Sequence, residues 1–191
     1  VLVTTLLLRL IGEDLWFVIP ALWSLLPFYN LFRFLKVPLM PTVPEDERIP
    51  LKKLFVSKIF LVAMLLMLCA GASELAMSQW SSLFAERALG VSKVVGDLMG
   101  PCLFAVFMGI GRTLYGIWGE RIRLSRALAL CAVLCILCYL GTALFQNPLL
   151  ALLSCALCGF SVSLMWPGTF SLTAAAYPKG GTAMFGVLAV L

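Results

Sequence analysis

The sequence contains no histidine. This absence removes the Ser-His-Asp and Cys-His nucleophiles, and histidine-based metal sites, from the chemistry open to the chain. Charge is also scarce, because 12% of the 191 residues are charged, whereas a soluble domain has about 25%. With 62% hydrophobic residues and a mean hydropathy of +1.06, the chain is typical of a protein embedded in a bilayer. We therefore predict a membrane protein that is not an enzyme and uses no cofactor.

Seven cysteines are present, and two pairs, Cys135 with Cys138 and Cys155 with Cys158, have the Cys-x-x-Cys spacing. Such spacing can indicate a redox motif or a metal site. All seven, however, lie inside apolar segments, with no acidic cluster beside them. We interpret them as small apolar core residues and predict no metal site.

Apolar segments long enough to cross a bilayer make up most of the chain. A membrane-spanning helix needs about 20 residues, and five segments reach this length: 15–35, 54–84, 91–118, 126–145 and 149–176. Shorter apolar runs stand at both ends, 1–11 and from Thr182 onward. The start lacks a signal peptide, and the end stops inside an apolar run, so we expect a fragment of a longer chain. The predicted fold is an all-α polytopic membrane protein with about five full spans and truncated helices at both ends.

Residues 37–53 form the only extended polar stretch, rich in proline and charge, and they read as a linker between two parts of the chain. If the spans alternate, the linker shares its side with ten of the basic residues, and the opposite side holds three. This bias places the linker in the cytoplasm. The net charge of +5 is therefore interpreted as topology, and no nucleic-acid partner is predicted.

A glycine-rich apolar run over residues 109–119 stops at a cluster of charge. Small residues allow helices to approach closely in lipid, and arginines just past a helix end hold that end in the cytoplasm. The segment Gly116-Ile-Trp-Gly119-Glu120-Arg121-Ile-Arg123 resembles the Gly-x-x-x-Asp-Arg-x-Gly-Arg-Arg signature of the major facilitator superfamily, in the copy that joins helices 8 and 9. Here Glu120 replaces the Asp, and Arg123 stands in place of the second Gly.

Together with Gly71-Ala-Ser-Glu74 through Trp80 on the preceding helix, the pattern is similar to the fucose-permease-like branch, which includes proton-coupled sugar carriers. The resemblance implies a carrier of twelve helices. Residues 1–36 would end its N-terminal half (the tail of helix 5 and helix 6), 37–53 would be the cytoplasmic linker between halves, and 54–191 would hold helices 7–10 and the start of helix 11. The missing N-terminal half would then be a partner.

By the same resemblance, the function is secondary transport of a small polar solute, a monosaccharide, by alternating access and with proton symport. The location would be the bacterial inner or cytoplasmic membrane. Two alternatives stay open: an exporter of drugs or other small molecules with the same fold, and a membrane scaffold that does not transport.

Glu74 is the one acidic residue well inside a predicted span, and a buried acid in lipid indicates a functional site. Ser78 and Ser81 follow at i+4 and i+7 on the same face, and Gln79 and Trp80 lie alongside. Such groups suit a polyol, through hydrogen bonds to hydroxyls and stacking on the indole. The predicted substrate-binding residues are Glu74, Ser78, Gln79, Trp80 and Trp166. The alternative is structural: Glu74 bonds a neighbouring helix or lies near the outer headgroups, and Trp166 packs in the bundle.

Trp166-Pro167-Gly168 is expected to kink its helix. Arg112 either extends to the cytoplasmic surface or pairs with an acid on a facing helix as part of an inner gate. The resemblance assigns the other gate residues. Gly116 and Gly119 would permit close packing, Glu120 would accept a charge-assisted hydrogen bond, and Arg121 and Arg123 would face lipid phosphates or the partner half.

Overall fold

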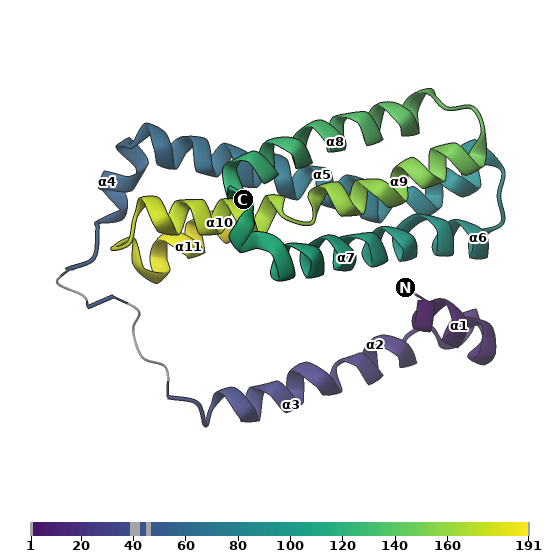
Figure 1. Ribbon diagram of the computed structural model, residues 1–191. Coiled ribbons are helices and arrows are strands. Elements are labelled where there is room, and N and C mark those ends of the chain that lie inside the picture. The colour runs from purple at the N-terminus through teal and green to yellow at the C-terminus, as the bar shows by residue number, and fades with distance from the viewer. Residues whose placement is uncertain (1, 39–42, 45–46, 191) are drawn as a thin grey trace. The chain divides into compact units, whose positions relative to one another are not determined.

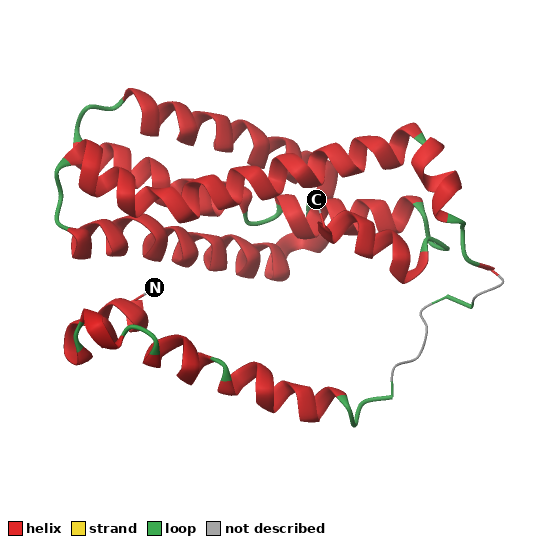
Figure 2. Ribbon diagram, turned by 180° about the vertical axis from the view of Figure 1, so that it is seen from behind, coloured by secondary structure: helices red, strands yellow, loops and turns green. Residues whose placement is uncertain are grey.

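The computed structural model describes residues 2–38, 43–44 and 47–190 (Figure 1). The chain divides into two compact units, Val1–Pro41 and Thr42–Leu191. Within the described residues every regular element is a helix, and no strand occurs (Figure 2). The predicted all-α class is therefore confirmed.

The first unit holds α1 (Leu2–Ile11), the short 3-10 helix η1 (Glu13–Leu15), α2 (Val18–Trp23) and α3 (Leu25–Phe34). The sequence predicts one kinked span over 15–35, and the structure divides it at Ser24. Pro27 has no N–H to donate to the carbonyl of Trp23, which is where α2 ends. The helical path nevertheless continues, since the Ser24 N–H donates to Pro20 at 2.9 Å and the Phe28 N–H to Ser24 at 3.1 Å.

The second unit is a helical bundle, and its elements follow in chain order. They are α4 (Leu51–Val56), α5 (Lys58–Leu89), α6 (Lys93–Asp97), the π-helical segment η3 (Leu98–Cys102), α7 (Leu103–Trp118), the 3-10 turn η4 (Gly119–Arg121), α8 (Leu124–Leu144), α9 (Pro148–Val162), α10 (Met165–Ala176) and α11 (Gly181–Val190). Among the described residues, four stretches are long and apolar enough to cross a membrane: Lys58–Leu89, Lys93–Trp118, Leu124–Leu144 and Pro148–Ala176. These match four of the five predicted full spans.

Helix ends follow local sequence signals. Gly90 closes α5 with a left-handed φ of 67°, which a glycine adopts without strain. Asn147 opens α9, because its side-chain oxygen accepts the N–H of Leu149 at 2.9 Å. Pro148 follows at the first helical position, where no N–H is needed.

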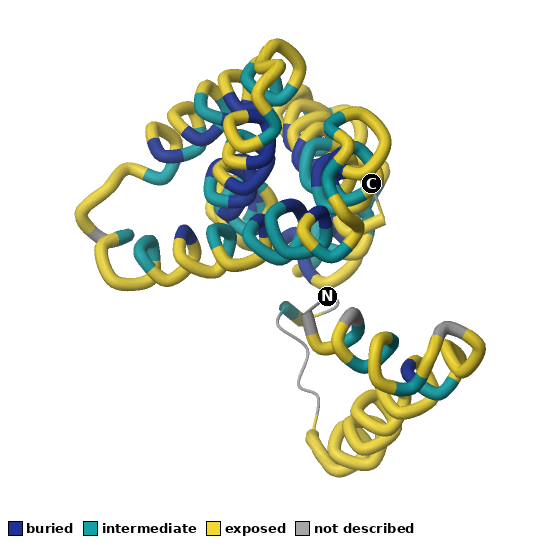
Figure 3. Tube along the Cα trace, turned by 90° about the vertical axis from the view of Figure 1, so that its right-hand side faces the viewer, coloured by how far each residue is buried: buried dark blue, intermediate teal, exposed yellow. Residues whose placement is uncertain are grey.

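The stretch Pro148–Ala176 lies at the centre of the bundle. In its apolar window 56% of residues are buried, against 22% in each of the other three spans. Figure 3 shows the buried positions gathered where the helices of the bundle face one another. One core cluster contains four of the cysteines, Cys135, Cys138, Cys155 and Cys158, packed with Phe104 and Val162 among others. These four are core residues, as predicted, whereas Cys69 is exposed.

Two glycines bring α7 and α9 into close contact. A Cβ on Gly159 would lie 2.0 Å from the backbone oxygen of Phe104, and a Cβ on Gly111 would lie 2.3 Å from Ser163 Oγ. Neither position has room for another residue without movement of a neighbour. Gly96 and Gly100 lie against α5 in a similar way, with a Cβ at Gly100 only 2.8 Å from Ser81 Oγ and a Cβ at Gly96 3.2 Å from the backbone oxygen of Ser82.

The end of the linker lies against the turn that follows α10. The Ile49 N–H donates to the carbonyl of Lys179 at 3.0 Å, and Lys179 Nζ pairs with Glu47 Oε2 at 2.9 Å. The linker and this turn therefore share one end of the bundle, as the alternation of spans requires.

Candidate functional site

The central helix is interrupted between α9 and α10, immediately before Trp166-Pro167-Gly168. Pro167 has no N–H, so it cannot donate to the carbonyl of Ser163, four residues earlier. Helical bonding resumes at once, since the Gly168 N–H donates to Leu164 at 2.7 Å. The kink that the sequence predicts is thus present, and it leaves one carbonyl without its helical donor.

Arg112 on α7 uses that carbonyl. Its Nε donates to the Ser163 oxygen at 3.2 Å. The two groups can meet because Gly111, the preceding residue, lets Ser163 approach α7. The end of a helix carries partial negative charge on its carbonyls, which favours a cation there. No other hydrogen bond and no ion pair of this guanidinium occurs among the described residues, so its terminal NH₂ groups remain available.

A cavity of about 370 Å³ opens beside this arginine, and we call it the Glu74 cavity. Its lining comes from three helices: Gly71, Glu74 and Leu75 of α5, Arg112 of α7 and Trp166 of α10. Glu74 is half-buried, and Arg112 is exposed. The volume lies in the range of small-molecule sites. An acid, a guanidinium and an indole thus face one space.

A second cavity of about 410 Å³, the Tyr115 cavity, is lined by Arg112, Tyr115, Gly116, Leu164, Trp166 and Pro167. Arg112 and Trp166 belong to both linings, so the two cavities adjoin at these side chains, and we refer to the pair of cavities as the groove. Arg112 stands at their junction. The groove therefore offers hydrogen-bond acceptors at Glu74, donors at Arg112, and a phenol at Tyr115.

The Trp166 indole packs against one other ring, which in turn packs against a third. It makes an edge contact with Phe170, with 4.5 Å between ring centroids, and Phe170 stacks on Phe185 of α11 at 5.6 Å. Trp166 is 38% exposed. An indole fixed on one side and open on the other can stack against the C–H face of a ring.

Three of the predicted binding residues are not brought to the Glu74 cavity. The Ser78 hydroxyl donates to Leu75 of its own helix at 3.4 Å, and Gln79 is exposed. Trp80 lines a different cavity, together with Ser81 and Tyr139. For Gln79 and Trp80 the reason is helical geometry: at about 100° per residue, they point roughly 140° and 120° away from Glu74 around α5.

Ser81 does share the face of Glu74, but two turns further along α5. There it is buried against Gly100 of η3, with 2% of its surface exposed. These side chains therefore do not line a single cavity. Glu74 and Trp166 share a cavity, and Trp80 and Ser81 belong to another one.

The signature residues lie at the end of α7 and in η4. Gly116 lines the Tyr115 cavity, and a Cβ built there would meet no atom within 4 Å, so within the described residues no helix of the second unit packs closely against it. Gly119 instead lies against the Tyr115 ring, 3.1 Å from a Cβ built at Gly119. Arg121 and Arg123 are exposed. The side chain of Glu120 lies outside the described part of the chain.

Two residues of the site, Tyr115 and Ser163, are absent from the predicted set, although the sequence carries a signal for each. Tyr115 lines the groove three residues after Arg112, and this i, i+3 spacing could have indicated it. The role of Ser163 follows from its place four residues before Pro167, a signal that is local and readable. The contact between Arg112 and Ser163 depends on how α7 packs against α9, which no local signal gives.

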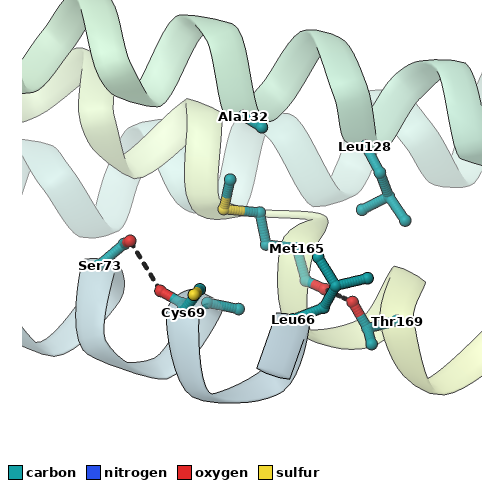
Figure 4. Close-up of a pocket in the computed structure, with 8 residues that line it drawn as sticks. Leu66, Cys69, Ser73, Leu128, Ala132, Met165 and Thr169 are labelled. Carbon is teal, nitrogen blue, oxygen red and sulfur yellow. Dashed lines mark hydrogen bonds between the residues drawn. The ribbon is translucent and has the colours of Figure 1, made fainter. Parts of the chain in front are cut away.

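Another cavity, of about 150 Å³, has a different character (Figure 4). Its lining is Leu66, Cys69, Ala70, Ser73, Leu128, Ala132, Met165 and Thr169. Both hydroxyls donate to carbonyls of their own helices, Ser73 to Cys69 at 2.7 Å and Thr169 to Met165 at 2.6 Å. With no charged group in its lining, this cavity suits an apolar occupant and is not a candidate for polar solutes.

Comparison with known families gives one finding. The model of the Major Facilitator Superfamily matches residues 1–191, which is the whole chain given and includes both units. Comparisons with curated proteins and with solved structures give no match.

Proposed function

The chain belongs to the Major Facilitator Superfamily, and we propose that it forms part of a carrier that moves a monosaccharide together with protons. Members of the family are secondary transporters of small solutes, not enzymes. The observation that carries the proposal is the Glu74 cavity, where an acid, an arginine and a tryptophan from three helices line one space.

The depth of this cavity in the bundle suits a transport site. Glu74 stands at the middle of α5, a helix that runs from Lys58 to Leu89. Trp166 stands beside the interruption between α9 and α10. In secondary transporters, solute sites lie near the middle of the bilayer, at helices that are broken. Charged groups at this depth are costly and are retained where they line a polar pathway.

Each wall of the cavity fits one part of a sugar. The Glu74 carboxylate accepts hydrogen bonds from hydroxyls, the Arg112 NH₂ groups donate to ring or hydroxyl oxygens, and the Trp166 indole stacks on C–H groups. The motif Gly71-Ala-Ser-Glu74 supports placement in the fucose-permease-like branch. Glu74 is assigned to solute binding, with Ser78, Gln79 and Trp80 outside its cavity.

The place of the chain in the carrier is also part of this proposal. Residues 1–36 end the first half, 37–53 link the halves in the cytoplasm, and 54–191 belong to the second half. The division into two units and the composition of the linker support this assignment. The first half would supply the opposite wall of the groove, and the signature residues Gly119, Glu120, Arg121 and Arg123 would act at the cytoplasmic gate of a bacterial inner membrane carrier.

The test uses the full-length carrier in proteoliposomes. Uptake of labelled monosaccharides is measured with and without an inward proton gradient, for wild type, Glu74→Gln and Glu86→Gln. Glu86 is exposed on the same helix, so it serves as the matched control. We expect gradient-driven uptake of one sugar that Glu74→Gln weakens and Glu86→Gln preserves. Extrusion of apolar dyes without uptake of any sugar would overturn the proposal in favour of an exporter.

A further inference from the structure

We propose that the preferred solute is a sugar acid whose carboxylate binds Arg112 while its hydroxyls bind Glu74. This inference rests on the proposed function, because it concerns the same groove, and it names the chemical class more narrowly. Three observations carry it: the anchoring of the guanidinium, its lack of a counter-ion among the described residues, and its place between the two cavities.

The first observation is that Arg112 is anchored by one N–H and leaves the others free. Nε is engaged by the Ser163 carbonyl, which Pro167 makes available and Gly111 brings near. The two terminal NH₂ groups then project as a planar fork. Such a fork matches the two oxygens of a carboxylate, and its bidentate bonds are stronger than bonds to neutral oxygens. An anchored fork also loses less freedom on binding.

The second observation concerns charge. Glu74 lines the same cavity, yet no ion pair joins it to Arg112 within the described part of the chain. Removing a cation from water without supplying a counter-ion costs free energy. A neutral sugar that fills the groove would displace water from the guanidinium and supply only neutral acceptors. A sugar acid would supply the opposite charge at the same point.

The third observation is the arrangement of the polar groups along the groove. Arg112 and Trp166 line both cavities, with Glu74 in one compartment and Tyr115 in the other. A ring stacked on Trp166 can therefore direct a carboxylate toward Arg112 and hydroxyls toward Glu74. The solute carboxylate would bind at Arg112 and away from the Glu74 carboxylate, since no ion pair or hydrogen bond joins the two side chains within the described part of the chain.

The experiment compares solutes that differ in one group. Glucose and glucuronate, and galactose and galacturonate, differ only by a CH₂OH or a carboxylate at the last carbon. Uptake of each is measured in the full-length carrier for wild type, Arg112→Gln, Arg112→Lys and the control Arg87→Gln, an exposed arginine at the end of α5. We expect a uronate to be preferred over its hexose by roughly 10- to 100-fold, the worth of hydrogen bonds to a charged group.

Arg112→Gln should abolish this preference, Arg112→Lys should keep part of it through charge without the fork, and Arg87→Gln should leave it unchanged. A competition measurement on the wild-type carrier alone tests the inference even if a variant fails to fold. The methyl ester of the preferred uronate keeps its shape and loses its charge, so it should compete for uptake at least about tenfold less well than the acid.

Equal competition by the ester and the acid would overturn the sugar-acid inference. So would preference for the neutral hexose with normal uptake in Arg112→Gln, although the monosaccharide proposal would then stand. Absence of uptake for every sugar and every uronate would instead overturn the proposed function itself.

Discussion

Arg112 on α7 and Ser163 at the end of α9 are joined by a hydrogen bond of 3.2 Å from Nε to a backbone carbonyl. The acceptor is free because Pro167, four residues later, has no N–H. Pro167 thus leaves free the carbonyl that holds Arg112 of another helix in place. The arginine, held in this way, stands where two cavities meet.

Gly111→Ala should destabilise the bundle by about 1–3 kcal/mol, because the new Cβ would lie 2.3 Å from Ser163 Oγ and 2.9 Å from Ser163 Cβ. Rotation of the serine hydroxyl cannot relieve the second contact, so the end of α9 must move. The measurement is reversible unfolding in detergent. Gly109→Ala is the matched control, since a Cβ there meets no atom within 4 Å, and it should be neutral or slightly stabilising. Equal effects of the two substitutions would contradict the close contact.

Pro167→Ala restores an N–H that can donate to Ser163 and compete with Arg112. We expect solute affinity to fall by about 2- to 10-fold, the effect of one hydrogen bond, while the protein remains folded. Pro148→Ala is the control, because Pro148 occupies the first position of α9 and is far from the break in sequence. The concentration dependence of uptake measures the effect. An unchanged KM in Pro167→Ala would show that the freed carbonyl does not position Arg112 for binding.

Replacement of two tryptophans distinguishes the cavities. Trp166→Ala removes the indole from the groove and should raise KM for the solute by roughly tenfold, through loss of stacking and contact area. Trp80 is 62% exposed and lines a different cavity, so Trp80→Ala should change KM by less than about twofold. Uptake kinetics for both variants provide the comparison, and the reverse order of effects would place the solute against Trp80.

Glu47→Gln removes the ion pair with Lys179 at the end of the linker. Both side chains are half exposed or more, at 50% and 61%, and exposed pairs contribute about 0–1 kcal/mol. Thermal unfolding should therefore change little, and the backbone bond from Ile49 to Lys179 should keep the linker in place. A loss above about 2 kcal/mol would mean that this pair has a structural role that its exposure does not explain.

The positions of the spans could be predicted from the sequence, because length, hydropathy and helix ends are local properties. Four of the helical stretches begin and end close to the predicted residues, and the break at Pro167 follows from the missing N–H of proline. The span over 15–35 differs because Pro27 removes a donor in its middle, so α2 and α3 are separated at Ser24 although the helical path continues.

The site could be predicted only in part. Glu74 stands out as an acid within an apolar helix, and Trp166 as an aromatic residue beside a break. Trp80 lies near Glu74 in the sequence, but six residues along a helix turn a side chain to another face. The position of Arg112 between two cavities depends on the packing of α7 against α9. That packing involves residues about 50 positions apart, beyond what periodicity can indicate.

The contact of α7 with α9 at Gly111 and Gly159 has a mechanical consequence. At Gly159 the backbone of α9 lies against the backbone of Phe104, and at Gly111 the backbone of α7 lies against the Ser163 side chain. Helices packed this closely would collide if they slid past each other, so we expect them to move as one body. The arginine on one helix and its carbonyl on the other then keep their spacing when the carrier changes shape. A rearrangement within this bundle would instead change the distance between the Arg112–Ser163 pair and α5, the helix that carries Glu74.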